Sequence, residues 1–249
     1  EVLRESEKVS VQARYVVLTA GALQTPALLL RAGIGNPEQL ASLGIGVVSA
    51  RPGVGKNLQD HPALTLAQYL PRHLRLPISY RRASFVAMRY SSDHPDADSS
   101  DMYVTASARA GWHALGQRLG LYFMWCNRPF SRGRLGLTSP DADSHPRIDL
   151  GLLSDERDVL RMMGAVRRVA ELVVSQAINP NPDDLFPAAF TPAIKKLSKV
   201  SSVNAGLNRI LGSMLDVPAP VRSRVLKHFM LQGQSLAGIL GNDNELEAF

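Results

Sequence analysis

The sequence contains a single cysteine, Cys126, in 249 residues. An intrachain disulfide is therefore impossible, and a lone cysteine fits a reducing compartment. On this ground we expect a cytoplasmic protein.

Long hydrophobic runs are missing as well. No stretch of about 18 apolar residues is present, which is the length that spans a bilayer, and the first residues do not show the basic and then apolar pattern of a secretory signal. We therefore expect no transmembrane segment. The chain begins with Glu1 and not Met, which leaves a targeting signal before this residue open.

Aromatic residues make up only 6% of the chain, although 28 Lys and Arg against 22 Asp and Glu give a net charge of +6. A nucleic-acid platform interleaves basic residues with aromatic side chains that stack on bases. Here the basic residues lie scattered in short stretches such as 72–82, 128–134 and 195–199. We interpret the charge as a solvated surface and expect no nucleic-acid partner.

Motifs for phosphate and metal binding are incomplete. A dinucleotide fingerprint needs a third glycine three residues after Gly-x-Gly, but Gly33-Ile34-Gly35 is followed there by Glu38 and Gly53-Val54-Gly55 by Leu58. The six histidines show no metal-ligand spacing, and one cysteine cannot build a zinc cluster. The sequence therefore predicts no metal site.

What is present begins with a strand, a turn and a helix. Residues Tyr15 to Leu18 are apolar without alternation, which predicts a strand covered on both faces of a parallel sheet. Thr25 followed by Pro26 predicts the start of a helix, and Gly33 predicts its end. A second helix should start at Asn36, and a short strand should follow over residues 45–49.

The turn between this strand and helix is the first candidate site. Nucleotide ligands bind at the carboxyl ends of parallel strands, so Ala20, Gly21 and Ala22 are predicted to contact a cofactor. Close packing of the strand against the helix explains the glycine almost as well.

Three motifs follow one another over about residues 13–178. The first comprises Gly21-Ala22, Thr25-Pro26, Leu28-Leu29 and Gly33-Ile34-Gly35, and the second is Gly53-Val54-Gly55-Lys56-Asn57-Leu58-Gln59-Asp60-His61-Pro62. The third comprises Arg128-Pro129-Phe130-Ser131-Arg132-Gly133, Pro146-Arg147-Ile148-Asp149 and Leu153-Ser154-Asp155. In this order they resemble the glucose-methanol-choline (GMC) family of FAD-dependent alcohol oxidoreductases, in particular its choline dehydrogenase-like members. Ala32 departs from the Ser that is usual in the family.

The resemblance implies an α/β plus α+β fold. Residues 1–62 would form the C-terminal part of a Rossmann-like FAD-binding domain, and residues 63–249 a substrate-binding domain with a mostly antiparallel sheet covered by helices. The implied activity is oxidation of a small-molecule alcohol to an aldehyde or ketone by hydride transfer to the flavin of FAD. The oligomeric state is not indicated.

The resemblance also places Asn57, Asp60 and His61 near the flavin. His61 could donate a hydrogen bond to the cofactor or lie at the mouth of the substrate cavity. Alternatively, Asn57 and Asp60 would bond backbone groups of the glycine-rich loop, with His61 packed at the domain junction. The structural role is favoured because Asx side chains readily satisfy loop backbone groups.

Two features of the family have no counterpart in this sequence, namely the glycine fingerprint and the His-Pro motif that contains the catalytic His. We therefore predict that the chain is an internal fragment without a catalytic residue of its own and is inactive by itself. The alternative is a non-catalytic remnant or interaction module that has the same fold but no cofactor.

The pattern changes after Pro62. Period-two alternation predicts antiparallel strands over residues 65–70, 83–90, 102–107, 119–125 and 134–138. A helix is predicted over residues 155–178 with an apolar stripe formed by Leu160, Met163, Val166, Ala170 and Val173. Weak helical patterns occur around residues 192–211 and 220–240. Members of the GMC family that this chain resembles are usually shorter here, so residues 180–241 are expected to form an insertion, which is either a cover for the substrate cavity or a surface excursion.

Overall fold

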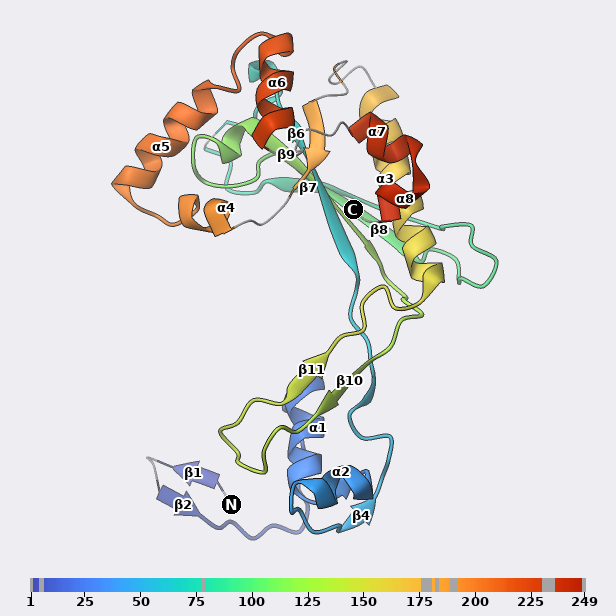
Figure 1. Cartoon of the computed structure of the whole chain (residues 1–249). Coiled ribbons are helices and arrows are strands. Elements are labelled where there is room, and N and C mark those ends of the chain that lie inside the picture. The colour runs from blue at the N-terminus through green and yellow to red at the C-terminus, as the bar shows by residue number, and fades with distance from the viewer. Residues whose placement is uncertain are drawn as a thin grey trace. The chain divides into compact units, whose positions relative to one another are not determined.

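The computed structural model describes residues 2–4, 7–77, 79–175, 181, 184–188, 192–229 and 236–247. The chain forms two compact units, the first from residues 1–59 with 132–151 and the second from residues 60–131 with 152–249 (Figure 1). These units are defined by packing and not by what they bind. The division into an FAD-binding part over residues 1–62 and a substrate-binding part over residues 63–249 therefore stays a prediction.

The first unit consists of short elements. Its strands are β1 (Val2–Arg4), β2 (Glu7–Val9), β3 (Ile34–Gly35), β4 (Ser49–Ala50), β5 (Lys56–Leu58), β10 (Gly133–Gly136) and β11 (Arg147–Asp149), and its helices are α1 (Gly21–Arg31) and α2 (Pro37–Ser42). Strands β1 and β2 form an antiparallel hairpin, β3 and β4 pair in parallel, and β5, β10 and β11 form an antiparallel sheet in the order β11-β10-β5.

Helix α1 starts four residues before the predicted cap. Its first residue is Gly21, and the Thr25 hydroxyl accepts a hydrogen bond from the backbone N–H of Ala20 at 3.0 Å. Thr25 therefore closes the first turn from inside the helix, and the prediction that it precedes the helix is wrong. Asn36 does cap α2, because its side chain accepts the backbone N–H of Gln39 at 3.1 Å.

The predicted strand at Tyr15 to Leu18 is not formed. Tyr15, Val16 and Val17 are 89%, 78% and 80% exposed, and no strand among the described residues pairs with them. A parallel strand exists only when neighbouring strands accept and donate its backbone hydrogen bonds. The apolar composition of this segment is therefore not sufficient to form a strand, and the prediction is wrong. The strand predicted over residues 45–49 is likewise reduced to the two residues of β4.

The first unit is held by a small apolar cluster in which α1 and α2 pack on β10. The buried members are Ala27, Leu30, Leu40, Leu135 and Leu137. Gly55 is required beside this cluster, because its φ is +82° and a Cβ there would lie 2.3 Å from the carbonyl oxygen of Leu135. The close approach lets Leu135 donate its N–H to the Gly55 carbonyl at 2.6 Å.

The second unit is larger and contains a five-stranded sheet. Its strands are β6 (Ala63–Tyr69), β7 (Ser84–Tyr90), β8 (Met102–Ser107), β9 (Leu119–Cys126) and β12 (Leu185–Pro187). Its helices are α3 (Glu156–Ser175), α4 (Pro192–Leu197), α5 (Ser202–Ser213), α6 (Ala219–Phe229), α7 (Leu236–Gly241) and α8 (Asp243–Glu247), with two 3-10 turns at Arg72–Leu74 and Gly116–Arg118.

The sheet order is β12-β6-β9-β8-β7, and every pair is antiparallel. The four longer strands lie within two residues of their predicted positions, because alternation over six to eight residues is a strong signal. The predicted fold class, with a mostly antiparallel sheet covered by helices, is confirmed.

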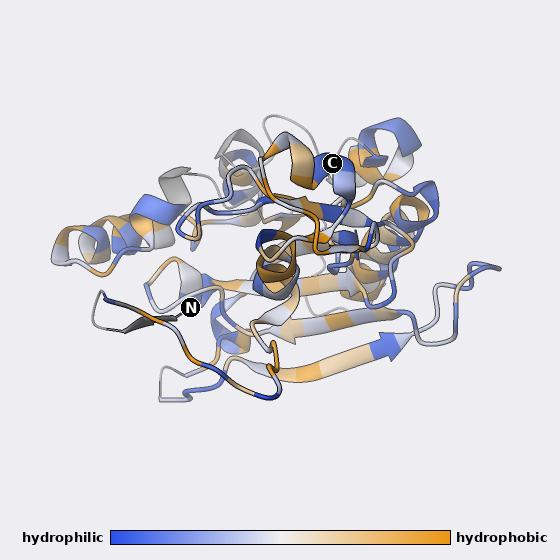
Figure 2. Cartoon of the chain, turned by 90° about the horizontal axis from the view of Figure 1, so that it is seen from below, coloured by the Kyte–Doolittle hydropathy of each residue, from blue (hydrophilic) through white to orange (hydrophobic). Residues whose placement is uncertain are grey.

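Helix α3 covers one face of this sheet, and α7 and α8 lie beside it (Figure 1). Hydrophobic residues recur along the strands of the sheet (Figure 2). Four of the five residues of the predicted stripe on α3 are buried, but Leu160 is 51% exposed, so its assignment to the core is wrong. The last predicted residues of this helix, 176–178, lie outside the described residues.

A buried charge network fixes the start of α3. Asp158 accepts the backbone N–H groups of Phe130 and Ser131 at 3.0 and 2.7 Å and also binds Arg161. Arg161 in turn donates to Asp101 at 2.8 Å, and the side chains of all three charged residues are at most 1% exposed. Burial opposes ionisation of both carboxyls, but the hydrogen bonds outweigh it and lower the pKa of Asp101 and of Asp158.

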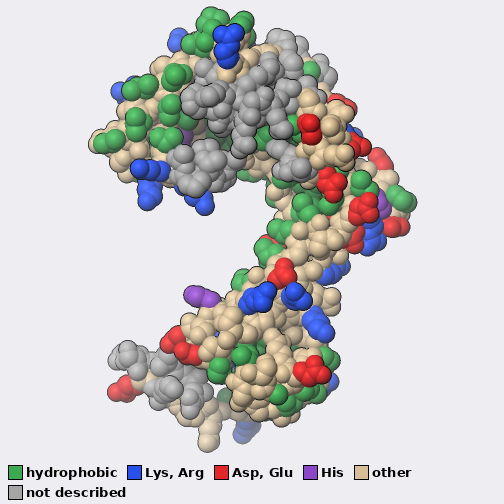
Figure 3. Space-filling view, in the orientation of Figure 1, with side chains coloured by type: hydrophobic (Ala, Val, Ile, Leu, Met, Phe, Trp, Pro, Cys, Tyr) green, Lys and Arg blue, Asp and Glu red, His purple; other side chains and the backbone are tan. Residues whose placement is uncertain are grey.

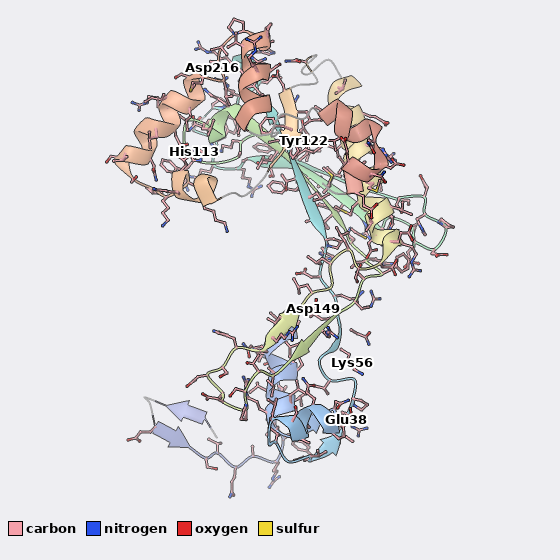
Figure 4. All side chains as sticks on the ribbon, viewed as in Figure 1. Glu38, Lys56, His113, Tyr122, Asp149 and Asp216 are labelled. Atoms are coloured by element: carbon pink, nitrogen blue, oxygen red, sulfur yellow. The ribbon has the colours of Figure 1, made fainter. Side chains whose placement is uncertain are left out.

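The predicted insertion over residues 180–241 includes α4, α5 and α6, and it is attached to the sheet by a second network. Asp216, in the turn between α5 and α6, accepts hydrogen bonds from Tyr69 at 3.1 Å, from Arg118 at 3.1 Å and from Arg75 (Figure 4). Burial would raise the pKa of Asp216, but its hydrogen bonds with Arg75 and Arg118 lower it to about 2.

We predict that Asp216→Asn lowers the free energy of unfolding at pH 7 by about 2 to 3 kcal/mol, because Arg75 and Arg118 lose their anionic partner. Since the folded pKa lies below the unfolded value, this stability is complete above about pH 4 and is lost as the pH falls toward 2. Urea denaturation of the wild-type protein and the variant over this pH range measures it.

The matched control is Asp98→Asn, which removes the ion pair between Asp98 and Arg128. The side chain of Asp98 is 71% exposed and that of Arg128 is 58% exposed, so this pair contributes little to stability. We expect the control to leave the free energy of unfolding nearly unchanged. Equal effects of the two substitutions would contradict the anchoring role of Asp216.

Candidate functional site

The turn at the start of α1 leaves its backbone open to a ligand. Gly21 has a φ of +80°, and a Cβ placed on it would meet no atom within 4 Å. Ala20, Gly21 and Ala22 are all exposed, and of these the Ala20 N–H is already bonded to Thr25. The first N–H groups of a helix favour anionic or polar groups. The turn therefore has space and donors for part of a nucleotide.

The other predicted cofactor residues lie in the segment that leaves the first unit. Asn57, in β5, adopts the left-handed conformation with a φ of +57°, which Asn tolerates better than most residues. Asp60 accepts the backbone N–H of His61 at 2.8 Å, and His61 is exposed. Asp60 thus makes the kind of local backbone bond that favoured a structural role.

These six residues are not brought together by any contact within one unit. Ala20, Gly21, Ala22 and Asn57 belong to the first unit, whereas Asp60 and His61 open the second. Their role at a cofactor stays a prediction.

The second unit contains an aromatic face that sequence reasoning missed. It comprises Tyr103, Phe123 and Trp125 with Thr65 and Thr105, all partly exposed. The strand register aligns Ala63, Trp125 and Tyr103 across β6, β9 and β8, and in the same way Thr65, Phe123 and Thr105. Because side chains alternate between the two faces of a sheet, these residues point away from α3. The rings of Tyr103 and Trp125 stack with centroids 4.5 Å apart at 28°.

This aromatic face is apolar and has no acidic strand residue. On β6 to β9 the same face carries a single charged residue, Arg89, which lies opposite Tyr103 and donates to the carbonyl of Ser100 at 2.8 Å. The polar atoms are largely used, since Trp125 donates to Asn127 at 2.8 Å and Thr105 to the Val86 carbonyl at 3.0 Å. The face can bind and orient an apolar molecule, but its own residues provide no base that would remove a proton.

The predicted insertion borders this face. Ala67, Tyr69 and Leu119 belong to the same face at the far end of the strands, and they pack with Leu215 and Leu226. The segment from α5 to α6 therefore covers one end of the sheet face, whereas Tyr103, Phe123 and Trp125 at the other end stay partly exposed among the described residues.

Other titratable groups of the second unit have structural roles. The only thiol, Cys126, is buried on the α3 side of the sheet, and burial raises its pKa, which makes it a poor nucleophile. Tyr122, on the same side, has its pKa raised by burial and donates to Gln68 at 2.6 Å (Figure 4). Among the residues that the structure describes, no group of three or more His, Cys, Asp and Glu side chains could hold a metal ion.

A groove of about 920 Å³ lies on the other side of the sheet, between α3 and the loop that follows β7. Tyr90 lines it, and the Tyr90 hydroxyl is buried without a hydrogen-bond partner among the described residues. Because Tyr90 and α3 share the face opposite Trp125, this groove does not adjoin the aromatic face.

Comparison with known proteins agrees with the motifs. The N-terminal region of the GMC oxidoreductase family matches residues 2–63, and its C-terminal region matches residues 129–209, which together make up more than half of the chain. The chain belongs to the GMC oxidoreductase family.

Two relatives are named as an oxidase and a dehydrogenase. A 5-(hydroxymethyl)furfural oxidase of Methylovorus sp. (strain MP688) is 38% identical over 180 residues, which cover 71% of this chain and 33% of the relative. An oxygen-dependent choline dehydrogenase of Chromohalobacter salexigens is 29% identical over 209 residues, which cover 68% of this chain and 36% of the relative. The chain therefore spans about a third of the length of these relatives.

Solved GMC structures share the fold. A variant of the formate oxidase of Aspergillus oryzae superposes with a TM-score of 0.55 at 16% identity, over 78% of this chain and 41% of that one. An FAD-dependent oxidoreductase of Chaetomium thermophilum superposes with a TM-score of 0.54 at 20% identity, over 77% of this chain and 43% of that one. At this level of identity the likeness shows the fold alone.

The residues of the aromatic face do not belong to the GMC motifs of the sequence. They are spread over three strands, and no short motif contains them together. Alternation within residues 102–107 and 119–125 indicates two faces, but only the register shows that Tyr103 lies beside Trp125. The signal available in the sequence was the pair of aromatic residues Phe123 and Trp125, which lie two positions apart in β9.

We predict that the backbone angle of Asn57, and not its amide, is what the fold needs. Asn57→Gly should leave the free energy of unfolding within about 0.5 kcal/mol, whereas Asn57→Val should lower it by about 1 to 2 kcal/mol, because a β-branched residue is strained at a φ of +57°. Urea denaturation of both variants tests this. Equal losses for Gly and Val would show that the fold depends on the amide.

Proposed function

We propose that this chain is the central part of an FAD-dependent oxidoreductase that converts an alcohol to an aldehyde or ketone. The observation that carries the proposal is the order of the two matched GMC regions, between which lie the four long strands that form the partly exposed aromatic face. In such a reaction the alcohol carbon loses a hydride and the hydroxyl loses a proton.

The residues of the first unit fit part of an FAD molecule. Gly21 leaves open space at the start of α1, where free N–H groups suit the polar portion of a nucleotide. We assign Ala20, Gly21 and Ala22 to that portion, and Asn57, Asp60 and His61 to the region near the flavin ring. FAD supplies the hydride acceptor when bound. The exposed segment from Tyr15 to Leu18 adds no support of its own.

The role of the aromatic face in this reaction is to bind and orient the substrate. The stacked rings of Tyr103 and Trp125 suit a small alcohol with a flat, uncharged body, because planar groups pack on aromatic rings without a charge partner. The higher identity to the furfural oxidase supports such a substrate. No base lies on this face, so the group that takes the hydroxyl proton would come from elsewhere in the complete enzyme. We also propose that the complete enzyme lies in the cytoplasm.

We predict that the 249-residue chain by itself gives no alcohol-dependent reduction of added FAD above a heat-treated control. Reduction above the control would contradict the assignment of this chain as a fragment. The flanking coding sequence provides an independent check. A reading frame that continues on both sides into a glycine fingerprint and a His-Pro motif supports the enzyme, whereas natural termini at Glu1 and Phe249 favour the remnant without cofactor.

In the protein encoded by such a longer frame, we predict that Trp125→Ala raises KM for a planar alcohol about three- to tenfold, because the stack with Tyr103 is lost. Trp112→Ala is the control, since Trp112 lies outside the aromatic face and is 46% exposed. Steady-state kinetics of both variants, with thermal unfolding to confirm folding, measure the effect. Equal KM values for Trp125→Ala and wild type would show that the aromatic face does not bind the substrate.

A further inference from the structure

Helix α5 exposes its apolar side chains. Val203, Leu207 and Ile210 are 71%, 45% and 63% exposed, and they recur at the spacing of one helix face. Val200 before the helix and Met214 after it continue the row, at 83% and 42% exposed. We call these five residues the apolar stripe.

The opposite side of α5 is packed and consists of Asn208 with the small residues Ala205 and Gly212, so the larger apolar side chains of this helix lie outside. Asn208 is fully buried, and its amide donates to the carbonyls of Leu197 and Asn204 at 2.9 and 2.8 Å. Asn204 donates in the same way to the carbonyls of Lys196 and Lys199. These bonds hold α5 to the end of α4 and to the connecting turn, so the apolar stripe is fixed on the outside.

The charges around the apolar stripe have one sign. Lys195, Lys196, Lys199 and Arg209 are exposed and make no ion pair among the described residues, and no Asp or Glu occurs between Leu185 and Leu215. Hydrophobic side chains gather over α5, with Lys and Arg side chains beside them (Figure 3). A surface that is both apolar and cationic matches the boundary of an anionic bilayer.

Trp112 extends this surface. Its indole N–H donates to the carbonyl of Ser198 in the turn between α4 and α5 at 3.3 Å, and the residue is 46% exposed. Tryptophan rings favour the headgroup level of a bilayer, because one end is apolar and the other donates a hydrogen bond.

We propose that α5 and the turn before it lie flat on an anionic lipid surface. No helix among the described residues combines the length and apolar character needed to cross a bilayer. Helix α5, at 12 residues or about 18 Å, suits insertion of one face only. A second copy of the chain fits less well, since a two-fold contact through the apolar stripe would bring the like charges of both copies together. The proposal is independent of the redox activity.

The test is co-sedimentation of the 249-residue chain with phosphatidylcholine vesicles, with and without phosphatidylserine. We expect binding to the anionic vesicles and at least about tenfold weaker binding to the neutral ones. Leu207→Ser combined with Ile210→Ser should weaken binding by about tenfold or more, because two exposed apolar side chains are removed. Lys195→Gln and Lys196→Gln should each weaken it about fivefold.

The matched control is Leu160→Ser combined with Leu172→Ser, which removes two apolar side chains of α3 that are 51% and 43% exposed. The control should bind like wild type. Circular dichroism confirms that each variant is folded, and all substituted residues are exposed.

A second readout uses Trp112 in a Trp125→Phe background, where it is the only indole. Its fluorescence should shift to shorter wavelength when phosphatidylserine vesicles are added. Absence of both binding and shift, or equal binding to neutral vesicles, would overturn the proposal. A concentration-dependent dimer that Leu207→Ser with Ile210→Ser abolishes would instead assign the apolar stripe to a contact between copies.

Discussion

The second unit depends on the buried network of Asp101, Arg161 and Asp158. Two carboxylates and one guanidinium would be costly to bury, and they are tolerated because they are paired with one another and hydrogen-bonded to the backbone. The bonds from Phe130 and Ser131 to Asp158 join the strand-connecting segment to the first turn of α3. The guanidinium of Arg157 lies 3.8 Å from the Phe130 ring centroid and that of Arg161 lies 4.8 Å from it, which encloses the ring.

This anchoring gives the sheet two different faces. Once α3 is fixed on one side, the even-numbered residues of β6 and β9, such as Leu66 and Met124, are buried under it. The odd-numbered residues then form the aromatic face, and the segment from α5 to α6 covers only the far end of that face. An uncovered aromatic surface on a rigid sheet is a suitable place to bind a small apolar molecule, because strand residues hold their positions better than loop residues.

The same segment provides a second surface with different chemistry. Asp216 and its arginine partners hold the turn after α5, while the asparagine amides hold the turn before it. Helix α5 is thereby fixed at both ends with its apolar stripe outward.

The sequence by itself determined the family, the order of the two matched regions and the four long strands, because glycine motifs and period-two alternation are local signals. It also predicted the cap at Asn36, which depends on residues three positions apart. It was wrong about Tyr15 to Leu18, because a parallel strand requires hydrogen-bonding neighbours that composition does not reveal. It was also wrong about Leu160, because the buried side of α3 runs through Asp158, Met162 and Val166, which leaves Leu160 on the other side of the helix. Only the tertiary structure decided that Tyr103 stacks on Trp125 and that α5 turns its apolar residues outward, since both depend on contacts between residues far apart in the chain.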